Sequence, residues 1–243
     1  MILVVSGTGT GVGKTVVTAA LAAVAASAGE RVAVVKPAQT GISEPDEASD
    51  LDEVRRLSGV TDLHELARFP DPLSPEAAAR NAGLPPLDMA YAATYIKDLS
   101  GTRDLVLVEG AGGLLVRYDP SGATIADLAA ALDAPVLVVT MAGLGTLNHT
   151  ALTLEALHAR GLACAGVVIG AWPASPGLAE LCNLADLSGV LIGRLPEGAG
   201  ALDRAAFLAT ARGLSARQSM ADSVYAHPSG HPAPSAGRGH VSN

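Results

Sequence analysis

A glycine-rich segment near the start of the chain carries the residue types that bind phosphate. It reads GTGTGVGKT over residues 7–15, between an apolar run and an Ala-rich run. Successive backbone N–H groups at the start of a helix surround an anion, and glycines let the backbone come close to it. Lys14 would then neutralise nucleotide phosphates, and the Thr15 hydroxyl would ligate Mg²⁺. Because the usual motif has glycine where this chain has Thr8, a tight strand–helix turn with a capping threonine is the alternative interpretation.

Two more charged side chains end predicted strands, and a third opens a predicted helix. Lys36 ends the run VAVVK and precedes Pro37, so its ammonium is expected near the phosphate loop, unless it is an ordinary surface lysine. Glu109 ends the run LVLVE, where a carboxylate is costly unless it is paired or bound to a metal. It is therefore a candidate ligand of Mg²⁺ or nucleotide, with helix capping as the alternative. Asp50 could add a second carboxylate, although by itself it is predicted to be a helix N-cap.

The segment GLGTLNH, residues 143–149, separates a predicted strand from a predicted helix. The backbone amides of Gly145, Thr146, Leu147 and Asn148 are expected at the helix N-terminus, where they would be open to a carboxylate or a phosphate. His149 lies in the first turn of the same helix, and we interpret it as structural and not as a general base.

The elements that would position these residues alternate along the chain. Continuous apolar runs, typical of strands covered on both faces, occupy residues 2–6, 32–36, 105–109, 136–140, 166–170 and 190–193. Helices are predicted over residues 14–29, 50–59, 86–100, 124–133 and 146–161. This alternation predicts an α/β fold with a doubly wound, mostly parallel sheet and helices on both faces. Ligands of such sheets bind beyond the carboxyl ends of the strands, where the residues above are placed.

Composition argues against several classes of protein. The chain is 49% hydrophobic but only 3% aromatic, and its net charge is −8. That charge disfavours a nucleic-acid-binding surface or a polybasic membrane surface. The chain shows no signal peptide and no apolar stretch long enough to span a bilayer, and its two cysteines, Cys164 and Cys182, have no metal-binding spacing. We therefore expect a cytoplasmic protein with no nucleic-acid and no membrane partner.

The two ends of the chain differ in character. Residues 1–224 are predicted to form a single domain. Residues 225–243 are dominated by Pro, Gly, Ser and His and have few large apolar side chains, so they are predicted to be a disordered tail. Three of the six histidines lie in this tail, where nothing in the sequence would hold them in a fixed metal geometry.

Four motifs together resemble one enzyme family. GTGTGVGKT, KPAQTG, EGAGG and GLGTLNH occur in this order at predicted strand ends, as they do in the dethiobiotin synthetases. That family commonly reads Gly-Thr-x-Thr-x-Val-Gly-Lys-Thr in its first motif, which accounts for Thr8. The resemblance covers roughly residues 2–215. It implies a P-loop NTPase fold and an ATP-dependent ligase (a cyclo-ligase) of biotin biosynthesis, acting on 7,8-diaminopelargonic acid and carbon dioxide as a homodimer.

The same resemblance implies a role for each candidate site residue. Lys36 and Lys14 are the expected catalytic residues, stabilising a carbamate and the γ-phosphate, and Thr15, Asp50 and Glu109 are the expected Mg²⁺ ligands. The implied nucleotide-binding residues are Gly11, Val12, Gly13, Lys14, Thr15, Val16, Asp50, Glu109, Gly110, Ala111, Gly112, Gly170, Ala171, Pro196, Glu197 and Gly198. The implied substrate-binding residues are Thr10, Thr40, Gly145, Thr146, Leu147 and Asn148. In the family, the helix N-terminus that holds the last four comes from the partner subunit.

One departure from the family concerns the nucleotide base. Many members have Asn-Asp, which reads adenine, where this chain has Gly170 and Ala171. Backbone groups there and at Pro196, Glu197 and Gly198 would have to read the base instead. Because losing side-chain hydrogen bonds weakens discrimination between bases, we expect a relaxed preference among ATP, CTP and GTP.

Two related classes of protein are the alternatives to this family. Positioning ATPases of the partitioning type carry a signature lysine early in the phosphate loop, where this chain has Gly9. An amidotransferase-linked synthase of corrinoid biosynthesis would need a glutaminase domain with a nucleophilic cysteine, for which the sequence has no room. The sequence therefore favours a dethiobiotin synthetase.

Overall fold

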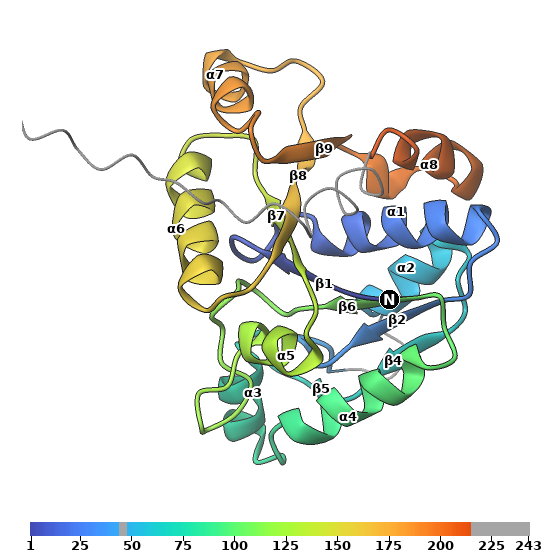
Figure 1. The fold of residues 1–243 in the computed structure, drawn as a ribbon, viewed down its shortest axis with the longest axis vertical. Coiled ribbons are helices and arrows are strands. Elements are labelled where there is room, and N and C mark those ends of the chain that lie inside the picture. Colours follow the sequence, from blue (N-terminus) through green and yellow to red (C-terminus); the bar gives the residue numbers. More distant parts are fainter. Residues whose placement is uncertain (44–47, 215–243) are drawn as a thin grey trace, which may run out of the picture.

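The central sheet is parallel throughout. Within residues 1–43 and 48–214, which the computed structural model describes, seven strands form it in the order β4-β2-β6-β1-β7-β8-β9 (Figure 1). These strands are β1 (Ile2–Gly7), β2 (Val32–Lys36), β4 (Leu63–Glu65), β6 (Leu105–Glu109), β7 (Val136–Thr140), β8 (Cys164–Trp172) and β9 (Leu191–Pro196). Two further strands, β3 (Gln39–Thr40) and β5 (Arg68–Phe69), pair separately in parallel.

Helices connect the strands and cover the sheet. They are α1 (Lys14–Ser27), α2 (Asp50–Ser58), α3 (Pro75–Ala82), α4 (Met89–Ser100), α5 (Ile125–Leu132), α6 (Thr146–Ala159), α7 (Leu178–Asp186) and α8 (Arg204–Ala211), with a short 3₁₀ helix, η1 (Ala199–Ala201). Several of them begin where a side-chain oxygen accepts a backbone N–H, as Ser49, Asp88, Thr124 and Asp203 do. Such caps stabilise a helix start by about 1 kcal/mol each.

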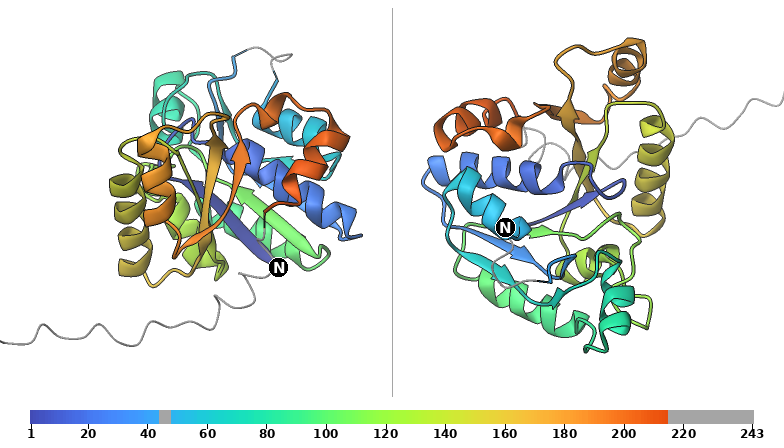
Figure 2. Two further views of the ribbon diagram at one scale, coloured as in Figure 1. Left: turned by 90° about the horizontal axis from the view of Figure 1, so that it is seen from above. Right: turned by 180° about the vertical axis from the view of Figure 1, so that it is seen from behind.

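Alternate residues of the strands face two separate apolar cores. In β1, Leu3 and Val5 belong to the core formed with α1, α2 and α8, whereas Val4 belongs to the core formed with α4 and α5. Figures 1 and 2 show these two groups of helices on opposite faces of the sheet. The doubly covered sheet explains why the strands read as continuous apolar runs and not as alternating ones.

Strand β1 lies in the middle of the sheet. Its residue Ile2 pairs with Val106 of β6, and Gly7 pairs with Val139 of β7. The connection that leaves β1 leads to β2 and the one that leaves β7 leads to β8, so the two run in opposite directions across the sheet. The carboxyl end of β1 is therefore at the switch point where doubly wound sheets bind their ligands.

The predicted fold class is confirmed, and most predicted elements are present. Strands β2, β6 and β7 have the predicted bounds, whereas β8 and β9 extend beyond the predicted residues 166–170 and 190–193. Strands β3, β4 and β5 and helices α3, α7 and α8 were not predicted. The three strands have only two or three residues each, which is too short for an apolar pattern to show. The predicted domain end at residue 224 and the predicted tail, residues 225–243, lie outside the described residues and stay predictions.

Candidate active site

The phosphate-loop segment connects β1 to α1 through two left-handed glycines. Gly11 has φ +75° and Gly13 has φ +95°, a region that residues with a Cβ resist. Gly13 is the N-cap of α1 and the helix start carries no side-chain cap. The hydroxyl of Thr15 instead donates to Oε1 of Glu109 at 2.9 Å. The alternative interpretation, a turn with a capping threonine, is therefore wrong.

Lys36 forms the centre of a buried ion cluster beside this loop. Its Nζ lies 2.8 Å from Oε1 of Glu109 and 2.5 Å from Oδ2 of Asp50, and it also donates to the carbonyl of Gly110 at 3.4 Å. The Lys36 side chain is 4% exposed. Burial lowers its pKa, but the charges and hydrogen bonds of the two carboxylates outweigh that effect and raise the pKa above the ordinary value. Lys36 is therefore held as an ammonium and is not a surface lysine.

Glu109 is fully buried at the end of β6. Its Oε1 accepts from Thr15 and Lys36, whereas Oε2 has no hydrogen-bond partner among the described residues. A buried carboxylate oxygen without a partner is costly. Glu109 does not cap a helix, so that alternative is wrong. The donor set of one hydroxyl and carboxylate oxygens, with one oxygen unused, fits a hard cation such as Mg²⁺.

Asp50 is not the helix N-cap that the sequence suggests. Ser49 is the N-cap of α2, and Asp52 completes the capping box by accepting from the Ser49 backbone N–H at 3.0 Å and hydroxyl at 2.7 Å. Those hydrogen bonds lower the pKa of Asp52. The carboxylate of Asp50 is thereby left free to face Lys36, while the buried Gln39 accepts the Asp50 backbone N–H at 3.2 Å. Asp50 thus pairs with Lys36, whereas Asp52 takes part in capping α2.

Lys14 is a second buried ammonium at the same place. Its Nζ donates to the carbonyl of Gly9 at 3.0 Å. Burial is the largest cause that lowers its pKa and the charge of Lys36 adds to it, with Glu109 and Asp50 acting in the opposite direction. Two ammonium and two carboxylate groups therefore meet at the floor of one cavity, and their formal charges cancel.

This cavity has a volume of about 650 Å³. Thr10, Gly11, Gly13, Lys14, Thr15, Val16, Lys36, Thr40, Asp50, Glu109, Ala111 and Gly112 line it, so most of the predicted site residues meet here. Sequence reasoning missed the opposite wall, which is Pro72–Pro75. The order Ser-Pro-Glu at residues 74–76 is a typical helix start and could have indicated that wall.

Tyr118 positions the EGAGG turn after β6 and was also missed. The backbone N–H of Ala111 donates to its hydroxyl at 2.6 Å. Burial raises the pKa of Tyr118 to about 12. Gly112, with φ +70°, approaches Thr10 of the phosphate loop: a Cβ on it would lie 3.6 Å from Oγ1 of Thr10. The EGAGG turn therefore packs directly against the phosphate-loop segment.

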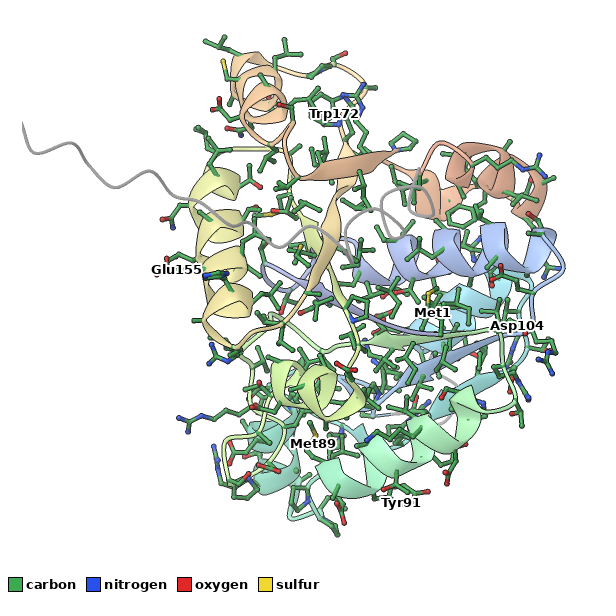
Figure 3. All side chains as sticks on the ribbon, in the orientation of Figure 1. Met1, Met89, Tyr91, Asp104, Glu155 and Trp172 are labelled. Atoms are coloured by element: carbon green, nitrogen blue, oxygen red, sulfur yellow. The ribbon has the colours of Figure 1, made fainter. Side chains whose placement is uncertain are left out.

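The residues predicted to read the base come together at the ends of β8 and β9. Trp172 pairs with Pro196, and the Glu197 N–H donates to the Trp172 carbonyl at 2.7 Å; Figure 3 labels Trp172 beneath α7. Gly170, however, is not a position from which an asparagine could reach a base. A Cβ placed on it would lie 2.0 Å from the Val12 carbonyl oxygen. Gly170 is needed for packing against the phosphate loop.

The N-terminus of α6 lies outside this cavity. Gly145 is the helix N-cap, and Asn148 and His149 are exposed. The backbone N–H of Thr146 donates to the Gly143 carbonyl at 3.3 Å, so the expectation that this amide is open to a ligand is wrong. The loop before the helix exposes apolar side chains, with Leu144 86% exposed.

Three comparisons with known proteins bear on this site. A family model described as an AAA domain matches residues 2–200. The ATP-dependent dethiobiotin synthetase BioD of Frankia casuarinae is 64% identical over 214 residues, which cover 86% of this chain and 90% of that relative. Its namesakes from Rhodococcus jostii and Streptomyces coelicolor are 61% and 58% identical, covering 86% of this chain and 92% and 90% of their own lengths. The chain belongs to the dethiobiotin synthetase family. As a dethiobiotin synthetase, it is an ATP-dependent ligase of biotin biosynthesis.

Solved structures agree with the fold of this dethiobiotin synthetase. The septum site-determining protein MinD with Mg-ADP from Pyrococcus horikoshii has a TM-score of 0.55 at 19% identity, over 92% of this chain and 95% of that one. The MinC:MinD complex of Aquifex aeolicus has a TM-score of 0.54 at 15% identity, over 94% and 99%. At such low identity the likeness shows the P-loop NTPase fold alone.

Two further observations concern the described part of this dethiobiotin synthetase. Among residues 1–43 and 48–214, no helix is long and apolar enough to cross a membrane. The same residues contain no cluster of three or more His, Cys, Asp or Glu side chains that could hold a metal ion.

Proposed function

We propose that the ion cluster around Lys36 carries out ATP-dependent closure of a ureido ring on 7,8-diaminopelargonic acid. One amine of this vicinal diamine attacks carbon dioxide, forms an N–C bond and loses a proton, giving a carbamate. A carbamate oxygen attacks the γ-phosphorus and breaks its bond to the leaving ADP. The second amine then attacks the carbonyl carbon of this mixed anhydride, loses a proton, closes the ring and expels phosphate.

The charges at the cavity floor support this assignment. Phosphoryl transfer needs positioning and neutralisation of charge more than covalent help from the protein. Lys36 and Lys14 bring two positive charges to the place where the carbamate and the γ-phosphate would meet, and the raised pKa of Lys36 keeps it an ammonium at neutral pH. The single observation that carries the proposal is this buried, permanently charged lysine beside a phosphate loop.

Thr15, Asp50 and Glu109 are the residues that would hold magnesium. The unpartnered Oε2 of Glu109 supports this. When bound, the ion would neutralise charge on the phosphate oxygens. The same two carboxylates pair with Lys36 here, so they keep its ammonium beside the phosphate loop.

The backbone at the ends of β8 and β9 would read the base. Gly170 has no side chain and the methyl group of Ala171 forms no hydrogen bonds. Discrimination between bases therefore falls to backbone amides and carbonyls, and CTP and GTP should support turnover at rates comparable to ATP. Comparing kcat/KM for the three nucleotides tests this, and an exclusive use of ATP would contradict it.

A homodimer would supply the rest of the diamine site. Exposed apolar side chains gather along α6 and the loop before it, among them Met141, Leu144 and Leu152 at 42%, 86% and 56% exposure. Such a patch favours burial against another surface. In a two-fold dimer, the first turn of α6 would reach the partner's cavity, where the backbone amides of Gly145, Leu147 and Asn148 would bind the substrate carboxylate. Light scattering after size-exclusion chromatography measures the oligomeric state, and a monomer would contradict this part.

The experiment for the whole proposal is phosphate release with Mg-ATP, with and without the diamine and bicarbonate. Wild type should release phosphate only when both are present. Lys36→Met and Asp50→Asn should both lose that activity, and circular dichroism must show that each variant is folded. Because Asp50 is 36% exposed, its variant keeps the fold even if the Lys36 variant does not. Phosphate release that is the same with and without the diamine would favour a positioning ATPase.

A further inference from the structure

A group of threonine hydroxyls joins the phosphate loop to the first turn of α6. Oγ1 of Thr140, at the end of β7, lies 2.7 Å from Oγ1 of Thr146, 2.8 Å from that of Thr150 and 3.3 Å from that of Thr8. Thr140, Thr146 and Thr150 are almost completely buried. Thr8 is the loop residue that stands where the usual motif has glycine, and its backbone N–H also bonds to the Val139 carbonyl at 2.9 Å.

The hydrogen bonds of this group can point in only one direction. A hydroxyl has one proton to donate and two lone pairs that accept. Thr146 gives its proton to the Met141 carbonyl at 2.7 Å, so Thr140 must donate to Thr146. Thr8 and Thr150 must then both donate to Thr140. Every donor and acceptor of Thr140 is used, which makes it the only side chain in the group with a full set of partners.

The loop before α6 is held from its other side as well. The side-chain amide of Asn183, on α7, donates to the carbonyls of Ala142 and Gly143 at 2.9 Å and 3.0 Å. Together with the bond from Thr146 to Met141, these contacts turn three successive carbonyls of the loop toward the protein. The conformation of residues 141–145 therefore depends on contacts inside the chain, and Thr140 is where those contacts meet the phosphate loop.

We propose that Thr140 is a positioning residue that couples nucleotide binding at the phosphate loop to substrate binding at the first turn of α6. A shift of Thr8 when phosphate binds would change the hydrogen bond to Thr140 and, through Thr146, the loop that precedes the helix. The inference rests on the proposed binding of the substrate carboxylate by α6. In a two-fold dimer it would link the nucleotide site of one subunit to the substrate site of the other.

Calorimetry with a non-hydrolysable ATP analogue and Mg²⁺ tests the coupling without turnover. The measured quantity is the ratio of the analogue's Kd without and with saturating diaminopelargonate. We expect a ratio of about fivefold or more in wild type. Thr140→Val, which keeps the shape but loses the hydroxyl, should bring the ratio to about 1, whereas Thr140→Ser should keep the wild-type ratio.

Two further variants test whether a loss of coupling in Thr140→Val is a purely structural effect. Thr8→Val breaks the connection from the loop side and leaves the packing of β7 and α6 intact, so it should lose the coupling even if Thr140→Val fails to fold. Thr153→Val is the matched control, because Thr153 lies on the same helix but donates only to the His149 carbonyl at 2.8 Å. The Kd ratio of Thr153→Val should therefore equal that of wild type.

The outcomes distinguish a failure of the coupling from a failure of the proposed substrate. Unchanged coupling in Thr140→Val or Thr8→Val, or a ratio of 1 in wild type that binds the diamine, would overturn the coupling role alone. Wild type that binds no diamine at all would overturn the proposed substrate, and the coupling with it. Loss of coupling in Thr153→Val would also overturn the inference, because the effect would then be general.

Discussion

Removing the ammonium of Lys36 should destabilise the free protein far more than removing its exposed partner. At 2.8 Å and an effective dielectric constant of about 20, the attraction between Lys36 and Glu109 is about 6 kcal/mol. Desolvation of the two charges offsets most of that gain. Once Lys36 is gone, however, the fully buried Glu109 keeps its desolvation cost and loses its counter-charge. We therefore expect Lys36→Met to lower the free energy of unfolding by about 3–5 kcal/mol.

The other partner of Lys36 provides the comparison. Asp50 is 36% exposed, and ion pairs that reach solvent contribute about 1 kcal/mol or less. Asp50→Asn should therefore leave stability nearly unchanged. The double variant Lys36→Met/Glu109→Gln should recover about 2 kcal/mol or more of the loss, because neither buried charge remains.

Urea unfolding at neutral pH, without nucleotide or divalent cations, measures these three variants and the single variant Glu109→Gln. For a domain of this size the loss in Lys36→Met corresponds to a fall in Tm of about 6–20 °C. A loss below about 1 kcal/mol would contradict the idea that the buried Glu109 depends on Lys36 for its counter-charge. A double variant as unstable as the sum of its single variants would refute the idea that the two charges depend on each other.

Three more outcomes follow from the site. Gly170→Ala should raise the nucleotide Kd by about tenfold or more, because its Cβ would lie 2.0 Å from the Val12 carbonyl oxygen and the phosphate loop would have to move. Fluorescence titration measures this Kd. Gly189→Ala is the control, because its Cβ would meet nothing within 4 Å. Nucleotide affinity should fall as pH rises through the pKa of Lys14, which burial lowers below its ordinary value, because the neutral amine no longer attracts phosphate. Lys14→Arg should remove that pH dependence. A pH profile of nucleotide affinity that is the same in Lys14→Arg as in wild type would contradict this role of Lys14. Tyr118→Phe should cost about 1–3 kcal/mol in urea unfolding, because it leaves the buried N–H of Ala111 without an acceptor, and no measurable loss would mean that the turn finds another partner.

The residues that could be predicted from the sequence share one local signal. Lys36 and Glu109 each end a continuous apolar run, and in a parallel sheet the carboxyl ends of strands meet at one edge. The role of Asp50 was harder to predict, because Ser49 and Asp50 are neighbouring residues that are both typical of a helix N-cap. Ser49 with Asp52 forms a capping box, a pattern that can be found in the sequence and that leaves Asp50 free.

The remaining features depend on contacts between distant segments. Nothing near Gly170 in the sequence indicates that the carbonyl of Val12 comes within 2.0 Å of where its Cβ would be. In the same way, Thr8 and Thr140 are separated by 132 positions and become neighbours only because β1 and β7 pair. Local propensity carries no information about such approaches, so they had to be found in the structure.

The position of β1 in the sheet also has a consequence for synthesis of the chain. Residue Ile2 finds its partner only when Val106 has been made, and Gly7 only when Val139 has been made. At about 5–20 residues per second, the strand that leads into the phosphate loop waits roughly 7–26 s after it is translated before its second neighbour exists. The strand that leads into the phosphate loop is thus made first and waits longer for its neighbours than the other strands of the described sheet. Its amino end, where Met1 bonds to the Asp104 carbonyl (Figure 3), must meanwhile be kept from pairing with other chains.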